Sequence, residues 1–246
     1  MAGEEISSFK EFQKIGHSAF ILGYTGKVGK ALTKELAKAK LFKKVFLIGR
    51  RQVQLDGDIG EEFEQIVVDF EKIEDYADIF KDIDVGFCCL GTTTKNGTES
   101  FVRVDHDYVI KSAELAKSGG CKHFNFISTK WADRNGTLLY IKTKGQVEEA
   151  LKVMHFNRLS VFRPGGILGH RDDSRLTETV ATFFLKPVTF LFPTAITIPV
   201  EMFAKAMIKN TVTPADHPVE ILENKDIHAI SGSLTMCHTD QKQAAD

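Results

Sequence analysis

A serine, a tyrosine and a lysine carry the clearest chemistry in this sequence. Ser128 ends an apolar run, and Tyr140 and Lys144 follow it with a spacing of four residues between them. A tyrosine and a lysine four apart project from the same face of a helix, where the ammonium stabilises a phenolate. Such a tyrosine exchanges a proton with a substrate oxygen, while the hydroxyl of Ser128, or of Thr129 beside it, donates to a carbonyl. The alternative is a surface pair, because this spacing alone is common.

A glycine-rich segment, GYTGKVG, follows the first apolar run directly. Gly23 permits a tight turn, Gly26 lets the backbone approach a pyrophosphate, and Gly29 allows close packing of a helix that begins near Lys27. The amides at that helix N-terminus then face phosphate oxygens. The position after a strand favours a dinucleotide site over an ordinary strand-to-helix turn.

Two adjacent arginines end the second apolar run, FLIGRR. In a dinucleotide-binding fold this point meets the adenosine ribose, where a carboxylate favours NAD and an arginine pairs with the 2′-phosphate of NADP. Arg50 and Arg51 stand in place of the carboxylate. They predict NADPH as the cofactor, and the alternative is a solvated basic turn.

Three further positions fit the same ligand. Asp69 accepts a hydrogen bond from the adenine amine, or else caps a helical segment that follows it. Gly91, in CLGTT at the end of the fourth run, lets the backbone pass close to the nicotinamide ribose, or is an ordinary turn glycine. Lys144 is expected to hold the same ribose.

Short apolar runs alternate with amphipathic segments along the chain. Strands that are apolar throughout and separated by helices indicate a parallel sheet covered on both faces. The βαβα order predicts an α/β fold, a Rossmann-like doubly wound parallel sheet. After about Pro164 the alternation becomes irregular, which predicts a small C-terminal substrate-side region. The runs are SAFIL (18–22), KVFLI (44–48), QIVVD (65–69), VGFCCL (85–90), HFNFIS (123–128) and LSVFRP (159–164).

Composition and charge limit the function classes. The chain has 246 residues, is 43% hydrophobic and carries a formal net charge of -1, so it can bury one large core and no global field favours nucleic acid or a membrane. Four cysteines without a CxxC spacing predict reduced thiols in an intracellular protein. The histidines have no metal-ligand spacing, so no metal is assigned.

We divide the chain into an N-terminal helical extension (1–16), the dinucleotide-binding domain (17–234, its substrate-side region from about 165) and a tail (235–246) that is expected to be disordered. Ile6, Phe9 and Phe12 lie at helical spacing in the extension. Packing on the protein's own body is favoured for them over docking of a partner.

Long stretches of the sequence resemble the HIV Tat-interacting protein 2 family, an atypical branch of the short-chain dehydrogenase/reductase superfamily, over roughly residues 17–230. They include FILGYTGKVG, LIGRR, VVDFEK, DVGFCCLGTT, FVRVDHDYVIKSAELAKSGGCKHFN, SVFRPG and EILENKDIH. The family usually has serine where this chain has Thr129, so the resemblance leaves open which hydroxyl of the pair serves. It implies an NADPH-binding Rossmann fold with these matching cofactor positions: Thr25, Gly26, Lys27, Val28, Arg50, Arg51, Leu90, Gly91, Tyr140, Lys144, Ile167 and Arg175.

The same resemblance implies a regulatory role. Family members are described as redox-sensing suppressors of growth and metastasis that bind importin β and restrain nuclear import. We therefore expect an NADPH-binding, dehydrogenase-like protein of the cytoplasm and nucleus that acts as a redox-sensing regulator of nuclear import and growth. Reduction of a small carbonyl substrate is expected as its chemistry from the serine, tyrosine and lysine set, and a monomer is favoured over an oligomer. A second hypothesis, from another class, is a regulator that uses bound NADPH as a conformational signal without turnover. Ordering of residues 169–184 by the cofactor through Arg175 is also expected, against the alternative of a loop already fixed by apolar packing.

Overall fold

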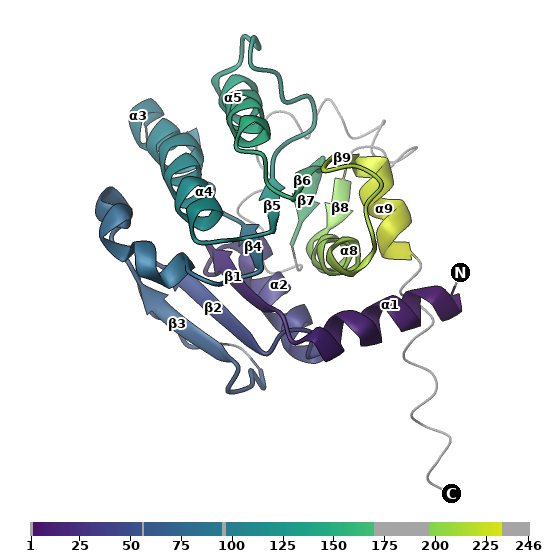
Figure 1. Cartoon of the computed structure of the whole chain (residues 1–246). Helices are drawn as coiled ribbons and strands as arrows, with labels where there is room; N and C mark the ends of the chain where they lie inside the picture. Colours follow the sequence, from purple (N-terminus) through teal and green to yellow (C-terminus); the bar gives the residue numbers. More distant parts are fainter. Residues whose placement is uncertain (1, 56, 95–96, 170–196, 233–246) are drawn as a thin grey trace, which may run out of the picture.

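Seven parallel strands form the central sheet of the protein, in the order β3-β2-β1-β4-β5-β6-β9 (Figure 1). The computed structural model describes residues 2–55, 57–94, 97–169 and 197–232. β7 and β8 form a separate pair of short parallel strands. The strands are β1 (Ser18–Leu22), β2 (Lys44–Gly49), β3 (Phe63–Val67), β4 (Val85–Cys88), β5 (His123–Ile127), β6 (Arg158–Arg163), β7 (Gly166–Leu168), β8 (Thr197–Pro199) and β9 (Val219–Glu223).

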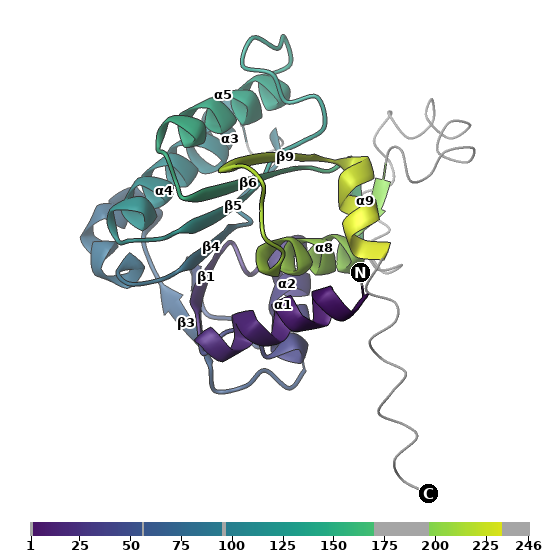
Figure 2. The same cartoon turned by 45° about the vertical axis from the view of Figure 1, so that its right-hand side comes forward.

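Helices cover both faces of the sheet, so the expected doubly wound α/β fold is confirmed. Figure 2 shows α3, α4 and α5 on one side and α1, α2 and α8 on the other. The helices are α1 (Ala2–Ile15), α2 (Lys27–Ala39), the 3₁₀ segment η1 (Phe70–Phe80), α3 (Thr98–Val102), the π-helical turn η3 (Arg103–Asp107), α4 (Tyr108–Ser118), α5 (Leu139–Val153), α8 (Val200–Val212) and α9 (Asn224–Gly232).

The two cores meet at β1, whose side chains alternate between the faces of the sheet. Phe20 and Leu22 belong to the core beneath η1, α4 and α5. Ala19 and Ile21 belong to the core beneath α2 and α8. All four side chains are fully buried, which explains why the strand reads as a continuous apolar run.

The strand ends agree with the sequence at β1 and lie within a residue or two elsewhere. β3 begins two residues earlier than the QIVVD run, at Phe63. The sequence did not indicate β9, because its exposed edge places Val219 and Ile221 among polar neighbours. This strand pairs with β6 and completes the sheet inside the region where the alternation had become irregular.

The N-terminal helix α1 packs on the body of the protein. Phe9 and Phe12 contact the core beneath α2 and α8, and the Phe12 ring lies 5.7 Å from that of Phe42, edge to face. Packing on the protein's own body is thus observed for these two side chains. No helix in the described ranges is long and apolar enough to cross a membrane.

Candidate cofactor-binding and active site

The glycine loop between β1 and α2 has the close contacts that its spacing predicts. Gly23 has φ +75°, and a Cβ there would lie 2.8 Å from the carbonyl oxygen of Cys89. A Cβ on Gly29 would lie 2.4 Å from the carbonyl oxygen of Gly23. Both positions therefore require glycine, the first for its turn and the second for the approach of the helix to the loop.

The N-terminus of α2 offers its backbone amides without a competing side chain. Gly26 is the N-cap residue, so no side chain caps the helix, and the first turn contains no acidic residue. The first amides of a helix lack intrahelical partners and favour an anion. Thr25, Lys27 and Val28 lie at this end, half-buried, where the sequence places the pyrophosphate.

The arginine pair follows β2 directly and is open to solvent. Both Arg50 and Arg51 are exposed, at the carboxyl end of the strand that neighbours β1. Carboxyl ends of parallel strands share one edge of the sheet, which is where open α/β sheets bind ligands. The pair is thus placed on the same edge as the glycine loop.

Asp69 caps the helical segment after β3. Its carboxylate accepts a hydrogen bond from the amide of Glu71 at 3.0 Å, as the N-cap of η1. The capping alternative is therefore the one seen in the structure, where η1 begins at Phe70. The contact from Asp69 to an adenine amine remains a prediction.

A buried ion pair joins the predicted catalytic lysine to a residue that the sequence did not single out. Lys144 Nζ lies 3.0 Å from Asp105 Oδ1, with the two side chains 4% and 1% exposed. The second carboxylate oxygen of Asp105 accepts from the amide of Thr92 at 2.7 Å. Asp105 thus connects the lysine with the loop after β4 that carries Leu90 and Gly91.

Asp105 lies at a local change in helix winding. It lies in the middle of η3, a π-helical turn inserted between α3 and α4. Inserted π turns are rare and frequently occur at functional sites. In the sequence, Phe101, Asp105 and Val109 are spaced by four, so a carboxylate occupies a position in an apolar stripe. A buried charge requires a partner, so a carboxylate in an apolar stripe is the sequence feature from which Asp105 could have been singled out.

Lys144 is fixed by more than one contact. Its ammonium also donates to the carbonyl of Ile127 at 3.3 Å and lies 5.1 Å from the centre of the Phe126 ring. An ammonium has three N–H groups. Within the described part of the chain, Asp105 and Ile127 account for two of them, which leaves one for a ligand.

Tyr140 lies in the first turn of the same helix, one turn before Lys144. Its side chain is 41% exposed, and its ring lies 5.8 Å from that of Phe101 in a tilted contact. Tyr140 is therefore open to solvent, and the buried lysine lies one helical turn away on the same face.

Ser128 is engaged with a second buried carboxylate. Its hydroxyl donates to Glu148 Oε1, and Glu148 forms a bidentate ion pair with Arg163, at 3.0 Å from Nε and 2.6 Å from the terminal nitrogen. Arg163 also contacts Glu223 at 3.2 Å. The Glu148 side chain is 1% exposed, so this network is an internal tie between α5, β5, β6 and β9.

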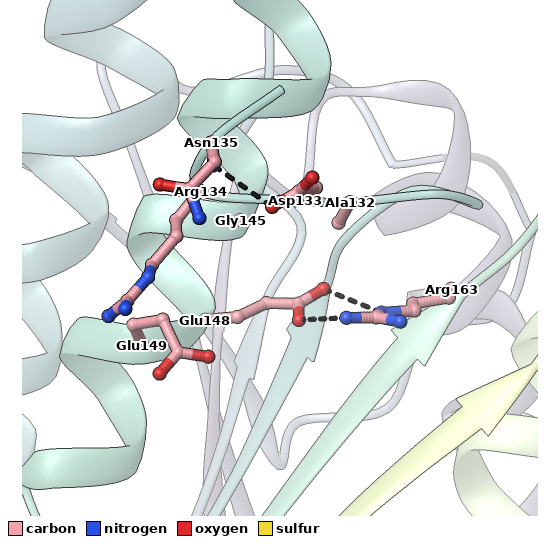
Figure 3. Close-up of a pocket in the computed structure, with 8 residues that line it drawn as sticks. All are labelled: Ala132, Asp133, Arg134, Asn135, Gly145, Glu148, Glu149 and Arg163. Carbon is pink, nitrogen blue, oxygen red and sulfur yellow. Dashed lines mark hydrogen bonds and ion pairs between the residues drawn. The ribbon is translucent and has the colours of Figure 1, made fainter.

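A pocket of about 360 Å³ lies beside this network, and Figure 3 shows the residues that line it. Glu148 points from α5 toward Arg163 on β6, and the loop with Asp133 and Arg134 closes the upper side. Neither Tyr140 nor Lys144 lines it. The pocket is therefore separate from the predicted proton-transfer pair. Tyr140 and Lys144, and not this cavity, indicate where the reaction is expected to take place.

The remaining predicted positions divide between described and undescribed parts of the chain. Ile167 lies in β7, half-buried against the core beneath α2 and α8. Arg175 and most of the segment 169–184 lie outside the described residues. No group of three or more His, Cys, Asp or Glu side chains in the described ranges could hold a metal ion.

Comparison with known proteins places this geometry in a family. Residues 23–175 match the NAD(P)H-binding family. Protein HTATIP2 of Rattus norvegicus is 47% identical over 219 residues, covering 89% of this chain and 90% of the relative. Protein FMP52-1, mitochondrial, of Scheffersomyces stipitis is 30% identical over 215 residues, covering 82% and 92%.

Solved structures show the same fold at low identity. UDP-N-acetylglucosamine 4-epimerase from Methanobrevibacter ruminantium has a TM-score of 0.64 at 18% identity, over 85% of this chain and 76% of that one. UDP-glucuronic acid 4-epimerase from Bacillus cereus, solved with NAD, has a TM-score of 0.64 at 16% identity, over 84% and 76%.

The fold and the glycine loop define an NAD(P)H-binding Rossmann-like protein of the short-chain dehydrogenase/reductase type. Within that class, the chain belongs to the HIV Tat-interacting protein 2 family.

Proposed function

We propose that the protein is an NADPH-dependent reductase of a small carbonyl substrate. The observation that carries this proposal is the buried, fixed ammonium of Lys144 one helical turn from the exposed Tyr140. The helix that bears both follows β5, whose carboxyl end shares an edge with the glycine loop and the arginine pair. Proton donor and cofactor elements therefore meet at one edge of the sheet.

The chain's own residues have distinct roles in this reaction. When bound, NADPH would supply the hydride that reduces the carbonyl carbon. Tyr140 gives its hydroxyl proton to the carbonyl oxygen, and the ammonium of Lys144 stabilises the phenolate that remains. The third N–H of Lys144 is available to a ribose hydroxyl. Thr129, rather than Ser128, is proposed to orient the carbonyl, because the hydroxyl of Ser128 already donates to Glu148. Neighbouring side chains in an extended segment point to opposite faces, so Thr129 points away from this carboxylate.

A turnover screen tests the reductase. Oxidation of NADPH is followed with a panel of aldehydes and ketones, and Tyr140→Phe is compared with the unmodified protein. The variant keeps the ring against Phe101 and removes the proton donor, so turnover should fall about a hundredfold or more while NADPH affinity changes little. Full turnover by Tyr140→Phe would remove the proposed role of this residue.

A second candidate function is a regulator that senses NADPH without turnover. It is favoured by the engagement of Lys144 and Ser128 with buried carboxylates, which leaves only part of the catalytic set open to a substrate. Partner binding, to importin β by family resemblance, would then depend on the bound cofactor. Cytoplasm and nucleus are the proposed locations, although the yeast relative is named as mitochondrial.

The three cysteines that the structure describes, Cys88, Cys89 and Cys121, are a poor basis for redox sensing by thiol chemistry. Burial raises the pKa of Cys88 to about 11 and of Cys121 to about 12, and raises that of Cys89 well above its usual range. A thiolate is the reactive form, so the raised pKa values keep these three thiols protonated at neutral pH. Within the described part of the chain, bound NADPH is therefore the proposed entry point of a redox signal. Binding of purified importin β, measured with NADPH and with NADP⁺, tests this: equal affinity in both would exclude cofactor sensing.

A further inference from the structure

Tyr24 is a bulky residue inside the glycine loop, and it fills the space beneath the end of β2. Its side chain is 1% exposed. A Cβ on Gly49 would lie 2.7 Å from Cε1 of the Tyr24 ring. The glycine of FLIGRR therefore leaves room for this ring directly before the arginine pair.

The hydroxyl of Tyr24 reaches the chain at the arginine pair. It lies 2.7 Å from the carbonyl oxygen of Arg51 and 2.7 Å from Oε1 of Gln65. Burial raises the pKa of Tyr24, with Arg51 partly opposing, so the hydroxyl remains a donor at neutral pH. A hydroxyl has one proton, which it donates to one of these two acceptors at a time.

Gln65 holds the next part of the same segment. This residue lies on β3, in register with Leu47 of β2. Its Oε1 accepts from the amide of Val53 at 2.9 Å, and its Nε2 donates to the carbonyl of Val53 at 3.0 Å. Gln65 thus holds two backbone groups of Val53, and Tyr24 holds the carbonyl of Arg51 when its proton points there.

The arginine side chains are exposed, while the backbone that carries them is held from below. Neither Arg50 nor Arg51 forms an ion pair with a residue that the structure describes. From this contrast we propose that Tyr24 and Gln65 are positioning residues that hold the arginine segment ready for a 2′-phosphate. They thereby help to set the preference for NADPH over NADH.

The physical reason is preorganisation. A hydrogen bond to a phosphate contributes less to the binding free energy when the group that donates it must first be ordered. A backbone already fixed at Arg51 and Val53 leaves only the guanidinium rotamers to be ordered on binding. NADH lacks the 2′-phosphate, so its affinity does not depend on this ordering. The selectivity, and not the affinity for dinucleotides in general, is the quantity that Tyr24 controls.

This inference rests on the proposed NADPH preference, and its test separates the two. The affinities for NADPH and NADH are measured by nucleotide fluorescence for the unmodified protein, Tyr24→Phe and Gln65→Met. Tyr76→Phe serves as a matched control, since Tyr76 packs on the other core, beneath η1. The exchange rate of the Val53 amide is measured by NMR for each protein without cofactor.

We expect Tyr24→Phe to lower NADPH affinity about threefold to tenfold and to leave NADH affinity within about twofold, since one net hydrogen bond is lost. Gln65→Met should do the same, and the Val53 amide should exchange faster in both. Equal loss of both affinities, or an unchanged ratio, overturns the inference, as does unchanged exchange at Val53. Equal NADPH and NADH affinities in the unmodified protein contradict the cofactor choice, whereas the exchange rates still decide whether Tyr24 and Gln65 fix the segment.

Discussion

Asp105 Oδ1 lies 3.0 Å from Lys144 Nζ, and both side chains are almost completely buried. The pair joins the π-helical turn before α4 to the helix that carries Tyr140. Through the amide of Thr92, Asp105 also holds the loop after β4. One carboxylate therefore contacts both the lysine proposed to be catalytic and the loop expected to contact the nicotinamide ribose.

Removal of Asp105 should destabilise the fold strongly. Asp105→Ala leaves the Lys144 ammonium buried without its counter-charge, and breaking such a pair costs about 3 to 5 kcal/mol of unfolding free energy. Asp107→Ala, an exposed carboxylate in the same turn, is the matched control and should change this free energy by less than about 0.5 kcal/mol. Urea unfolding measures both. Similar losses for the two variants would show that burial of the Asp105–Lys144 pair does not matter.

The two neighbouring hydroxyls should have different effects on turnover. Thr129→Val keeps the shape and removes the donor, so turnover on a substrate from the carbonyl screen should fall about a hundredfold, as for loss of one oxyanion donor. Ser128→Ala should lower it less than about threefold, because that hydroxyl donates to Glu148. The opposite order of the two effects would return the catalytic role to Ser128.

His123 should make the stability depend on pH in the mildly acidic range. Burial and the charge of Arg158 hold the pKa of His123 well below 6.5 in the folded chain. Below about pH 6.5 the unfolded chain binds a proton that the folded chain does not. The unfolding free energy therefore decreases as the pH is lowered, by up to about 1.4 kcal/mol per pH unit.

Unfolding between pH 7.5 and 5 measures this dependence. His123→Gln should flatten the curve over that window, while His217→Gln, an exposed histidine, should leave the curve as it is. A curve for His123→Gln with the original slope would mean that another group titrates there.

The sequence was sufficient for the elements that repeat a simple pattern. Continuous apolar runs located six strands, and the glycine spacing located the start of α2 at Lys27. It missed β9, because an edge strand with one exposed face lacks that continuous pattern. It also missed Asp105, Glu148 and Gln65, because the partners of these groups lie on other elements and become visible only when the sheet brings them together.

The most direct test of NADPH recognition uses the two exposed arginines, Arg50 and Arg51. NADPH and NADH are titrated against the unmodified protein and against Arg50→Ala/Arg51→Ala, with binding followed calorimetrically. We predict that the unmodified protein binds NADPH at least about tenfold tighter, which corresponds to roughly 1.4 kcal/mol of phosphate recognition, and that the double variant loses most of this ratio. Equal affinities for the two nucleotides in the unmodified protein, or an unchanged ratio in the variant, would contradict NADPH recognition by this pair.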